Sequence, residues 1–311
     1  MQAYDFEPMS IGGILDRTFK IYRDNFIRFI TIVAIIQVPI ALIMIVSLSV
    51  LQRGVPVQNR RASDQSVRET RQNPENFNFG RRRTSTNDAG QDENNPFVFF
   101  VGSFGMMISG ILGMLAHILC RGALTKSVSE SYLGAEITVA QAYSFVLPKF
   151  LTLIGAGILV VLIVYMGLIL LIVPGIIFAL WFALTTPAIV VENLKAIKGL
   201  SRSKDLASGN LGKIFSVGFL VIAISWVIGI PFSVVGGFLG RILFSNNMML
   251  MTFVNQLISI IGQVLIVPIG AIAYILLYYD LRIRKEGFDL IMLANSISSE
   301  QGGINVGQPE Q

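Results

Sequence analysis

Length, composition and charge place the chain among membrane proteins. Its 311 residues are 53% hydrophobic and only 14% charged, against about 25% charged residues in soluble domains, which excludes an ordinary soluble protein. The net charge of +5 is typical of the Lys and Arg excess in cytoplasmic loops and does not require nucleic acid, while the single cysteine, Cys120, excludes an intrachain disulfide and a multi-cysteine metal site.

The chain opens with a short amphipathic segment and a first span. Ser10 stands at the N-cap position of SIGGILDRTFKIYRDN, in which apolar residues recur at helical spacing on one face and basic residues lie on the opposite face. A span over residues 26–51 follows. The residues before it contain no apolar core of the signal-peptide kind, so we expect no cleavable signal peptide and expect this span to direct the chain to the membrane. Residues 52–95 are rich in Asn, Gln, Arg and Ser, which predicts a disordered polar loop.

Five further spans follow. The second covers residues 97–120 and is followed by an amphipathic segment, 121–149. The apolar run 150–191 is too long for one crossing, and Val173-Pro174-Gly175 within it predicts a turn. This gives spans over residues 150–172 and 174–191, paired as a tight hairpin. Spans five and six cover residues 214–239 and 252–278. A short helical piece around 288–297 and a flexible polar tail over 298–311 complete the chain.

The expected fold is an all-α polytopic membrane helix bundle in one integral membrane domain, 1–311. We expect three hairpins, each led by an interfacial amphipathic helix. An internal repeat supports this. Four residues near the first span recur before the fifth span at one constant offset in sequence, and a weaker copy between them places Lys149 where Arg28 stands in the first copy. The matched residues are Leu15, Arg17, Asn25 and Arg28 with Leu200, Arg202, Asn210 and Lys213.

The segment Glu192–Phe215 carries the one group of residues with a plausible binding role. Leu194, Ile197, Leu200 and Leu206 share a helical face, and most basic residues lie on the other. Such a helix between two spans is expected in the cytoplasmic interface. Its cations either contact anionic headgroups or only set the topology. Including the basic residues near the first span, the candidate lipid-headgroup contacts are Arg17, Arg28, Lys195, Lys198, Arg202, Lys204 and Lys213.

The spans offer little for catalysis or coupled transport. Their interiors contain no Asp, Glu, Lys or Arg, which argues against a proton-coupled pump. His117 is the only histidine; a metal or catalytic role is conceivable, but packing explains it more simply. The sequence contains no HExxH motif, phosphate-binding glycine loop or paired intramembrane aspartates. We therefore expect no enzyme activity, no cofactor and no metal.

Small residues and prolines recur within the spans. Small residues recur every fourth position, which favours close helix packing, with dimerisation or a substrate groove as alternatives. The prolines predict kinks, with broken helices around a midplane site as the alternative. The small residues are Gly105, Ser109 and Gly113, then Gly229, Ser233 and Gly237; the prolines are Pro187, Pro231 and Pro268.

Three stretches resemble a known bacterial family. They are SIGGILDRTFKIYRDNF, IVPGIIFALWFALTTPAIVVENLKAIKGLSRSKDLASGNLGKIF and, most specifically, YYDLRIRKEGFDL. The chain resembles the membrane domain of glycerophosphoryl diester phosphodiesterases and related multi-span proteins. In that family the domain sometimes precedes a soluble catalytic barrel, whose His, Glu and Asp pattern this chain lacks. The resemblance therefore implies a membrane domain and no catalytic residue.

The expected role is non-catalytic. The chain would organise or sense phospholipid, or scaffold a partner, in the bacterial cytoplasmic membrane; the alternative is a transporter of a lipid-like or uncharged solute. Lys and Arg counts favour both termini in the cytoplasm, although the basic residues of 52–95 then lie outside. The expected partner is membrane phospholipid, with a protein partner or a second copy also open, and no nucleic acid.

Overall fold

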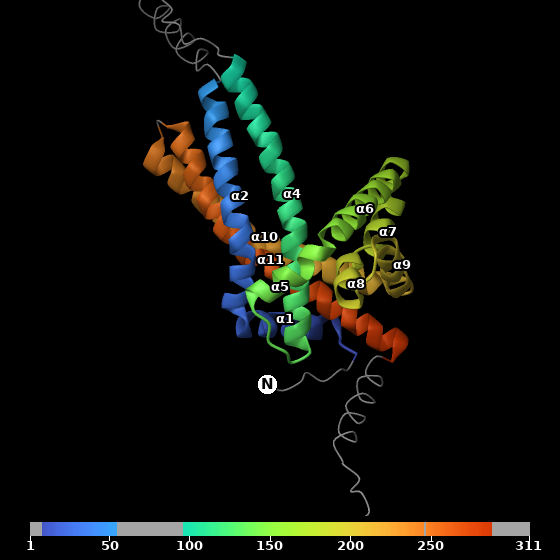
Figure 1. The fold of residues 1–311 in the computed structure, drawn as a ribbon. Helices are drawn as coiled ribbons and strands as arrows, with labels where there is room; N and C mark the ends of the chain where they lie inside the picture. The colour runs from blue at the N-terminus through green and yellow to red at the C-terminus, as the bar shows by residue number, and fades with distance from the viewer. Residues whose placement is uncertain (1–7, 55–95, 246, 288–311) are drawn as a thin grey trace, which may run out of the picture.

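A computed structural model describes residues 8–54, 96–245 and 247–287 of the chain. Within these ranges every regular element is helical, and six helical segments are long and apolar enough to cross a membrane (Figure 1), which confirms the predicted fold class. The elements are α1 (Ile11–Asp24), α2 (Phe26–Gly54), α4 (Pro96–Tyr132), α5 (Val139–Val146), the 3-10 helix η1 (Leu147–Lys149), α6 (Phe150–Leu170), α7 (Ile172–Trp181), α8 (Thr185–Glu192), α9 (Ala196–Ala207), α10 (Leu211–Phe244) and α11 (Met248–Glu286).

The helices form three hairpins that diverge from one end of the molecule. A short helix precedes each hairpin: α1 leads into α2 and α4, α5 into α6 and α7, and α9 into α10 and α11. Figure 1 shows the short helices gathered at the lower end, with the hairpins rising away from it. We call this end the base; it contains α1, α5, α8, α9, the end of α4 from Arg121 to Tyr132 and the end of α11 from Ile269 to Glu286.

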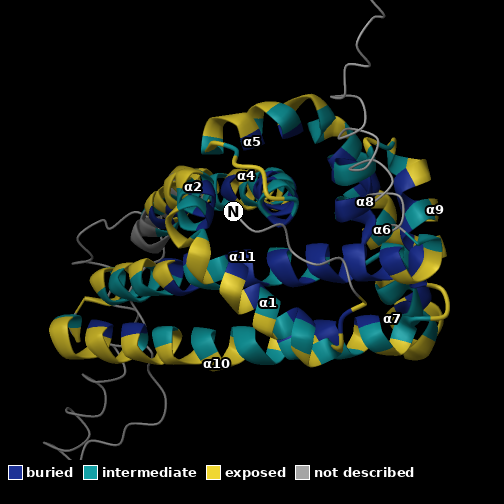
Figure 2. Ribbon diagram, turned by 90° about the horizontal axis from the view of Figure 1, so that it is seen from below, coloured by how far each residue is buried: buried dark blue, intermediate teal, exposed yellow. Residues whose placement is uncertain are grey.

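The buried core lies at the base. Tyr278, Tyr279 and Tyr132 are almost fully buried there, as are Ile14 of α1 and Phe29 of α2. Figure 2, seen from below, shows burial concentrated along α11 and exposure along the outer sides of the hairpins. α11 has 39 residues and is therefore about 58 Å long, nearly twice the roughly 30 Å of a hydrocarbon core. Its last turns must extend beyond the hydrocarbon, into the base.

The observed helices differ in extent from the predicted spans. α4 continues from Cys120 to Tyr132, so the first part of the predicted amphipathic segment 121–149 extends the second span, and α11 continues from Tyr278 to Glu286. Residues 52–54 of the predicted loop belong to α2. The rest of the predicted loop, the helical piece at 288–297 and the tail at 298–311 lie outside the described residues.

The turn of the middle hairpin lies slightly earlier than predicted. α6 ends at Leu170, Leu171 is extended, and Pro174 and Gly175 belong to the first turn of α7. Close approach explains the glycine: a Cβ on Gly175 would lie 2.8 Å from the backbone nitrogen of Leu168. Proline fits the first helical turn, where its missing N–H costs nothing.

The two predicted small-residue faces have different outcomes. In α4, Gly105 faces Ser47 of α2 and Ser109 is buried, so this face packs as predicted. In α10 the closest contacts lie one residue away from the predicted face. A Cβ on Gly236 would lie 2.7 Å from the Asn255 side-chain oxygen and one on Gly240 2.7 Å from the Met251 carbonyl oxygen, whereas one on Gly237 would meet nothing within 4 Å. The helical period alone did not distinguish these adjacent faces.

The prolines also have different outcomes. α10 and α11 run without interruption through Pro231 and Pro268, so neither helix is broken at its proline. The fourth span is interrupted between Trp181 and Thr185, just before Pro187. Ser203 of α9 bridges the interruption, because its hydroxyl donates to the Trp181 carbonyl (2.7 Å) and accepts from the Leu184 N–H (3.1 Å).

Candidate functional site

The end of α11 is the centre of the polar contacts at the base. Its sequence YYDLRIRKEG supplies two buried tyrosines, a buried aspartate, three basic residues and a glutamate. Tyr279 shares a 2.6 Å hydrogen bond with Ser129 and stacks on Tyr132, both of α4. This end of α11 therefore ties α4 to the charged groups described next.

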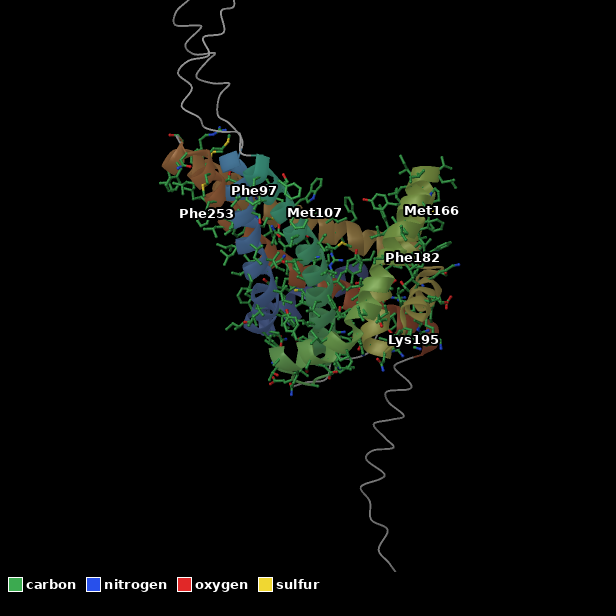
Figure 3. The ribbon with its side chains drawn as sticks, turned by 45° about the horizontal axis from the view of Figure 1, so that its top comes forward. Phe97, Met107, Met166, Phe182, Lys195 and Phe253 are labelled. Carbon is green, nitrogen blue, oxygen red and sulfur yellow. The ribbon has the colours of Figure 1, made fainter. Side chains whose placement is uncertain are left out.

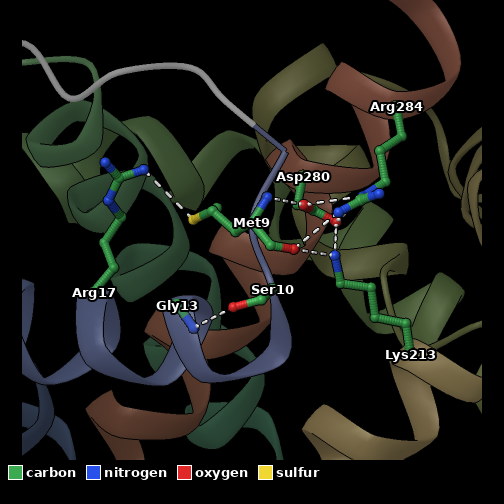
Figure 4. A network of polar contacts seen from close by, with 7 residues as sticks. All are labelled: Met9, Ser10, Gly13, Arg17, Lys213, Asp280 and Arg284. Atoms are coloured by element: carbon green, nitrogen blue, oxygen red, sulfur yellow. Dashed lines mark hydrogen bonds and ion pairs between the residues drawn. The ribbon is translucent and has the colours of Figure 1, made fainter.

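Asp280 joins the N-terminal segment to α10 and α11 (Figure 4). Its carboxylate has no exposed surface and accepts from the Met9 N–H (2.7 Å), the Lys213 ammonium (2.5 Å) and the Arg284 guanidinium (3.2 Å). Lys213 and Arg284 also donate to the Met9 carbonyl, at 2.6 and 2.9 Å. Ser10 then caps α1 by accepting from the Gly13 N–H, as predicted. One buried carboxylate with two cations thus fixes the entry to α1.

Arg202 of α9 is the centre of a second ion-pair network. Its guanidinium lies 2.8 Å from the Glu192 carboxylate of α8 and also pairs with Glu286 of α11. Glu192 also accepts from the Tyr278 hydroxyl (2.5 Å), and Arg282 bonds Glu286 at 3.2 Å. The hydrogen bond to Glu286 and those to Glu192 raise the pKa of Arg202 above its ordinary value. This network fixes α9 against α8 and α11.

The apolar face of α9 packs against the protein. Leu200, Ser203 and Leu206 are buried, and Gly199 allows the close approach, because a Cβ there would clash with the Ile189 side chain of α8. The sequence places Leu200 and Leu206 on the apolar face of an interfacial helix, and the structure buries both of them against protein. Ile197 is the exception, with 75% of its surface exposed.

A glycine ends α9, and the next helix follows almost at once. Gly209 adopts a left-handed backbone (φ +83°) that stops the helix. Asn210 occupies the N-cap position of α10 but makes no side-chain cap hydrogen bond. The next helix begins at Leu211, so α9 is held on a very short connection to α10.

The seven predicted headgroup residues divide into three groups. Arg202 and Lys213 belong to the two networks above. Arg17 and Arg28 contact the end of α4: Arg17 lies over the Tyr132 ring, and Arg28 lies 3.9 Å from Glu136, just beyond α4. Exposed on the outside of α9 are Lys195, Lys198 and Lys204.

We call Lys195, Ile197, Lys198 and Lys204 the outer face of α9. No acidic residue of the described ranges pairs with its three lysines; Lys204 lies 4.9 Å from the centre of the Trp181 ring. Figure 3 shows Lys195 at the edge of the base, below the rising hairpin that carries Met166. An exposed isoleucine between unpaired lysines is typical of a surface that meets a lipid interface.

Several residues of the base were not predicted as functional or structural partners. The most important are Glu192, Asp280 and Glu286, which hold Arg202 and Lys213. A signal was present, because Asp280 with Arg284 and Arg282 with Glu286 stand four residues apart and form ion pairs along α11. Ion pairs between residues that are far apart in the sequence leave no such spacing pattern. Among the described residues, no group of three His, Cys, Asp or Glu side chains could hold a metal ion.

Comparisons with known proteins agree with the membrane fold. Over 104 residues the chain is 33% identical to UPF0259 membrane protein SG1383 of Sodalis glossinidius (strain morsitans), a match that covers 32% of this chain and 40% of that protein. The chain therefore matches less than half of that relative's length. No solved structure matches the chain.

A family model covers a larger part of the chain. The model of DUF7847, a domain of unknown function, matches residues 95–281. This range includes the middle and last hairpins, α9 and the buried end of α11 through Asp280. Because the match exceeds half of the 311 residues, this multi-pass membrane protein belongs to the DUF7847 family.

Proposed function

We propose that the protein is a non-catalytic membrane module that binds anionic phospholipid through the outer face of α9. The observation that carries the proposal is the contrast between cations within one helix. Arg202 is held by two carboxylates, whereas Lys195, Lys198 and Lys204 are exposed without an acidic partner among the described residues. Cations left exposed beside a membrane span favour anionic headgroups by about 1 kcal/mol each.

The rigid attachment of α9 supports binding rather than a topological role alone. Ion pairs to α8 and α11, the Ser203 bridge and the close Gly199 contact hold the helix in place. A topology determinant needs charge but no fixed geometry. A headgroup site gains from a fixed helix, because the backbone that carries the three lysines loses no further freedom on binding.

We place the protein in the bacterial cytoplasmic membrane with the base in the cytoplasm. Met9 contacts Asp280, so both ends of the described chain lie at the base. The resemblance to the membrane domain of glycerophosphoryl diester phosphodiesterases agrees with a lipid-related role and transfers no activity. A protein partner or a second copy of the chain is a further candidate for binding to the base.

The test is native mass spectrometry of the full chain in mild detergent with phosphatidylglycerol. Lys195, Lys198 and Lys204 are changed together to Gln. We expect lipid retention to fall by a factor of one hundred or so, about 1 kcal/mol for each charge. The control, K20Q/R23Q/R241Q, removes three charges elsewhere. An equal loss in both variants would show that retention follows net charge, and no loss in either would reject the proposal.

Transport of a lipid-like or uncharged solute is the second candidate. The observation in its favour is the interruption of the fourth span between α7 and α8, because transporter sites often use discontinuous helices. Lipid flux in reconstituted vesicles distinguishes the two functions: equal leaflet exchange with and without the protein would reject transport and leave the binding role.

A further inference from the structure

Each hairpin begins with a cation, and the three cations have different surroundings. Lys213 binds Asp280 at 2.5 Å, and Arg28 bonds Ser131 at 3.3 Å and lies 3.9 Å from Glu136. Lys149, at the start of α6, has a buried ammonium that makes no hydrogen bond to the described residues. The cation at this position of the repeat therefore has polar partners in two of the three units, whereas the ammonium of the third has no hydrogen-bond partner among the described residues.

The Lys149 ammonium lies beside a second lysine. Its nitrogen is 3.7 Å from the centre of the Phe145 ring of α5, and the Lys126 nitrogen of α4 is 4.2 Å from the same centre. The two ammonium groups are therefore no more than about 8 Å apart, with a ring shared between them. Lys126 pairs with Glu130, whereas the positive charge of Lys149 has no carboxylate partner among the described residues.

A desolvated ammonium without hydrogen bonds is costly, and a neighbouring cation adds to the cost. Contact with one aromatic face offsets only part of it. An anion that accepts hydrogen bonds from both lysines would supply the missing partner and offset the positive charge. Each ammonium has three N–H donors, and charge-assisted bonds of about 2.8 Å to two oxygens of one phosphate bridge nitrogens several ångströms apart.

We propose that Lys126 and Lys149 bind the phosphate of an anionic lipid where α4, α5 and α6 meet. Lys149 directly precedes α6, which contains no charged residue from Phe150 to Leu170. Ile111 and Met114 of α4 and Ile158 and Leu162 of α6 are exposed on the hairpins beyond the lysines. A phosphate held by the lysines thus lies at the edge of apolar helix surfaces that acyl chains can cover, which favours a lipid over a free phosphate ion.

The inference rests on the proposed lipid-binding role for its ligand class, but it uses none of the residues of the outer face of α9. Lys149 is partly exposed along its side chain although its nitrogen is covered. A rotamer change that moves the ammonium off Phe145 therefore presents it to a headgroup without moving a helix.

The test is lysine footprinting of the natural, full-length chain in lipid nanodiscs. An amine-acetylating reagent is applied in phosphatidylglycerol and in phosphatidylcholine nanodiscs, and modification of each lysine is quantified by mass spectrometry. We expect phosphatidylglycerol to slow acetylation of Lys149 and Lys126 about fivefold, the effect of one headgroup contact of about 1 kcal/mol. Lys285, whose ammonium donates to the Asp205 and Ser208 carbonyls, is the internal reference.

Two further arms identify the source of the phosphate and separate the two proposals. Millimolar inorganic phosphate is added to phosphatidylcholine nanodiscs: equal protection there would replace the lipid with a soluble anion. The K195Q/K198Q/K204Q variant should retain full protection of Lys149. Evidence against lipid binding by the outer face of α9 would therefore not count against this second site. The K126Q variant should lose protection of Lys149. Unchanged acetylation of Lys149 in phosphatidylglycerol would overturn the proposal.

Discussion

Lys213 places its ammonium 2.5 Å from the Asp280 carboxylate, which has no exposed surface. The two residues belong to different helices of the last hairpin, and both also hold the Met9 backbone. The pair is therefore the point at which α10, α11 and the entry to α1 are joined. It removes Lys213 from the set of freely available cations at the base.

Asp280→Asn should be strongly destabilising. The change leaves Lys213 and Arg284 without their carboxylate, and removing one partner of a buried ion pair typically costs about 3–5 kcal/mol. Thermal unfolding in detergent, followed by tryptophan fluorescence, checks this. Asp205→Asn is the control, since that residue is exposed and should unfold as the natural protein does. The K213Q/D280N double variant should lose less than the sum of the single changes.

Ser203→Ala should weaken the attachment of α9 to the interrupted fourth span. The change leaves the Leu184 N–H and Trp181 carbonyl without the hydroxyl that now binds both, at a cost of about 1–3 kcal/mol. Ser201→Ala, at an exposed position on the same helix, is the matched control. Equal unfolding temperatures for the two variants would contradict the bridging role.

Gly240→Ala should push α10 and α11 apart, whereas Gly237→Ala should not. A Cβ at Gly240 would meet the Met251 carbonyl at 2.7 Å, and one at Gly237 would meet nothing within 4 Å. We expect a loss of about 1–3 kcal/mol for the first change and a neutral or slightly stabilising effect for the second, because alanine favours helix. Thermal unfolding of the two variants measures the difference. A reversed order would support the face predicted from the sequence.

Cysteine labelling tests the proposed orientation. The only native cysteine, Cys120, is buried and should not react. Ser201→Cys in α9 should react with a membrane-impermeant maleimide only after permeabilisation, and Ser245→Cys at the opposite end of α10 should react in intact cells. Reaction of Ser201→Cys in intact cells, with Ser245→Cys protected, would invert the orientation.

Much of the fold follows from local sequence. Runs of apolar residues fix the spans, Ser10 and Gly209 fix helix ends, and the repeat of short helix, cation and hairpin predicts the order of units. The turn at Leu171 differs slightly from the prediction because proline is favoured inside the first helical turn as well as before it.

Less of the candidate site could be predicted from the sequence. Amphipathicity showed that α9 has an apolar face, but the same pattern serves packing on protein and insertion in lipid. Only the structure places Leu200 and Leu206 against protein and leaves Ile197 exposed. Likewise, the cation at the start of each hairpin is visible in sequence, whereas its carboxylate partner, or the absence of one at Lys149 among the described residues, depends on segments far apart in the chain.

The contact between Met9 and Asp280 has a consequence for biosynthesis. The two residues are separated by 271 positions, and chains are synthesised at about 5–20 residues per second. The Met9 N–H thus waits for tens of seconds before its partner leaves the ribosome. Each hairpin can enter the membrane as it is made, but the junction at the base closes only after the sixth long helix has been translated.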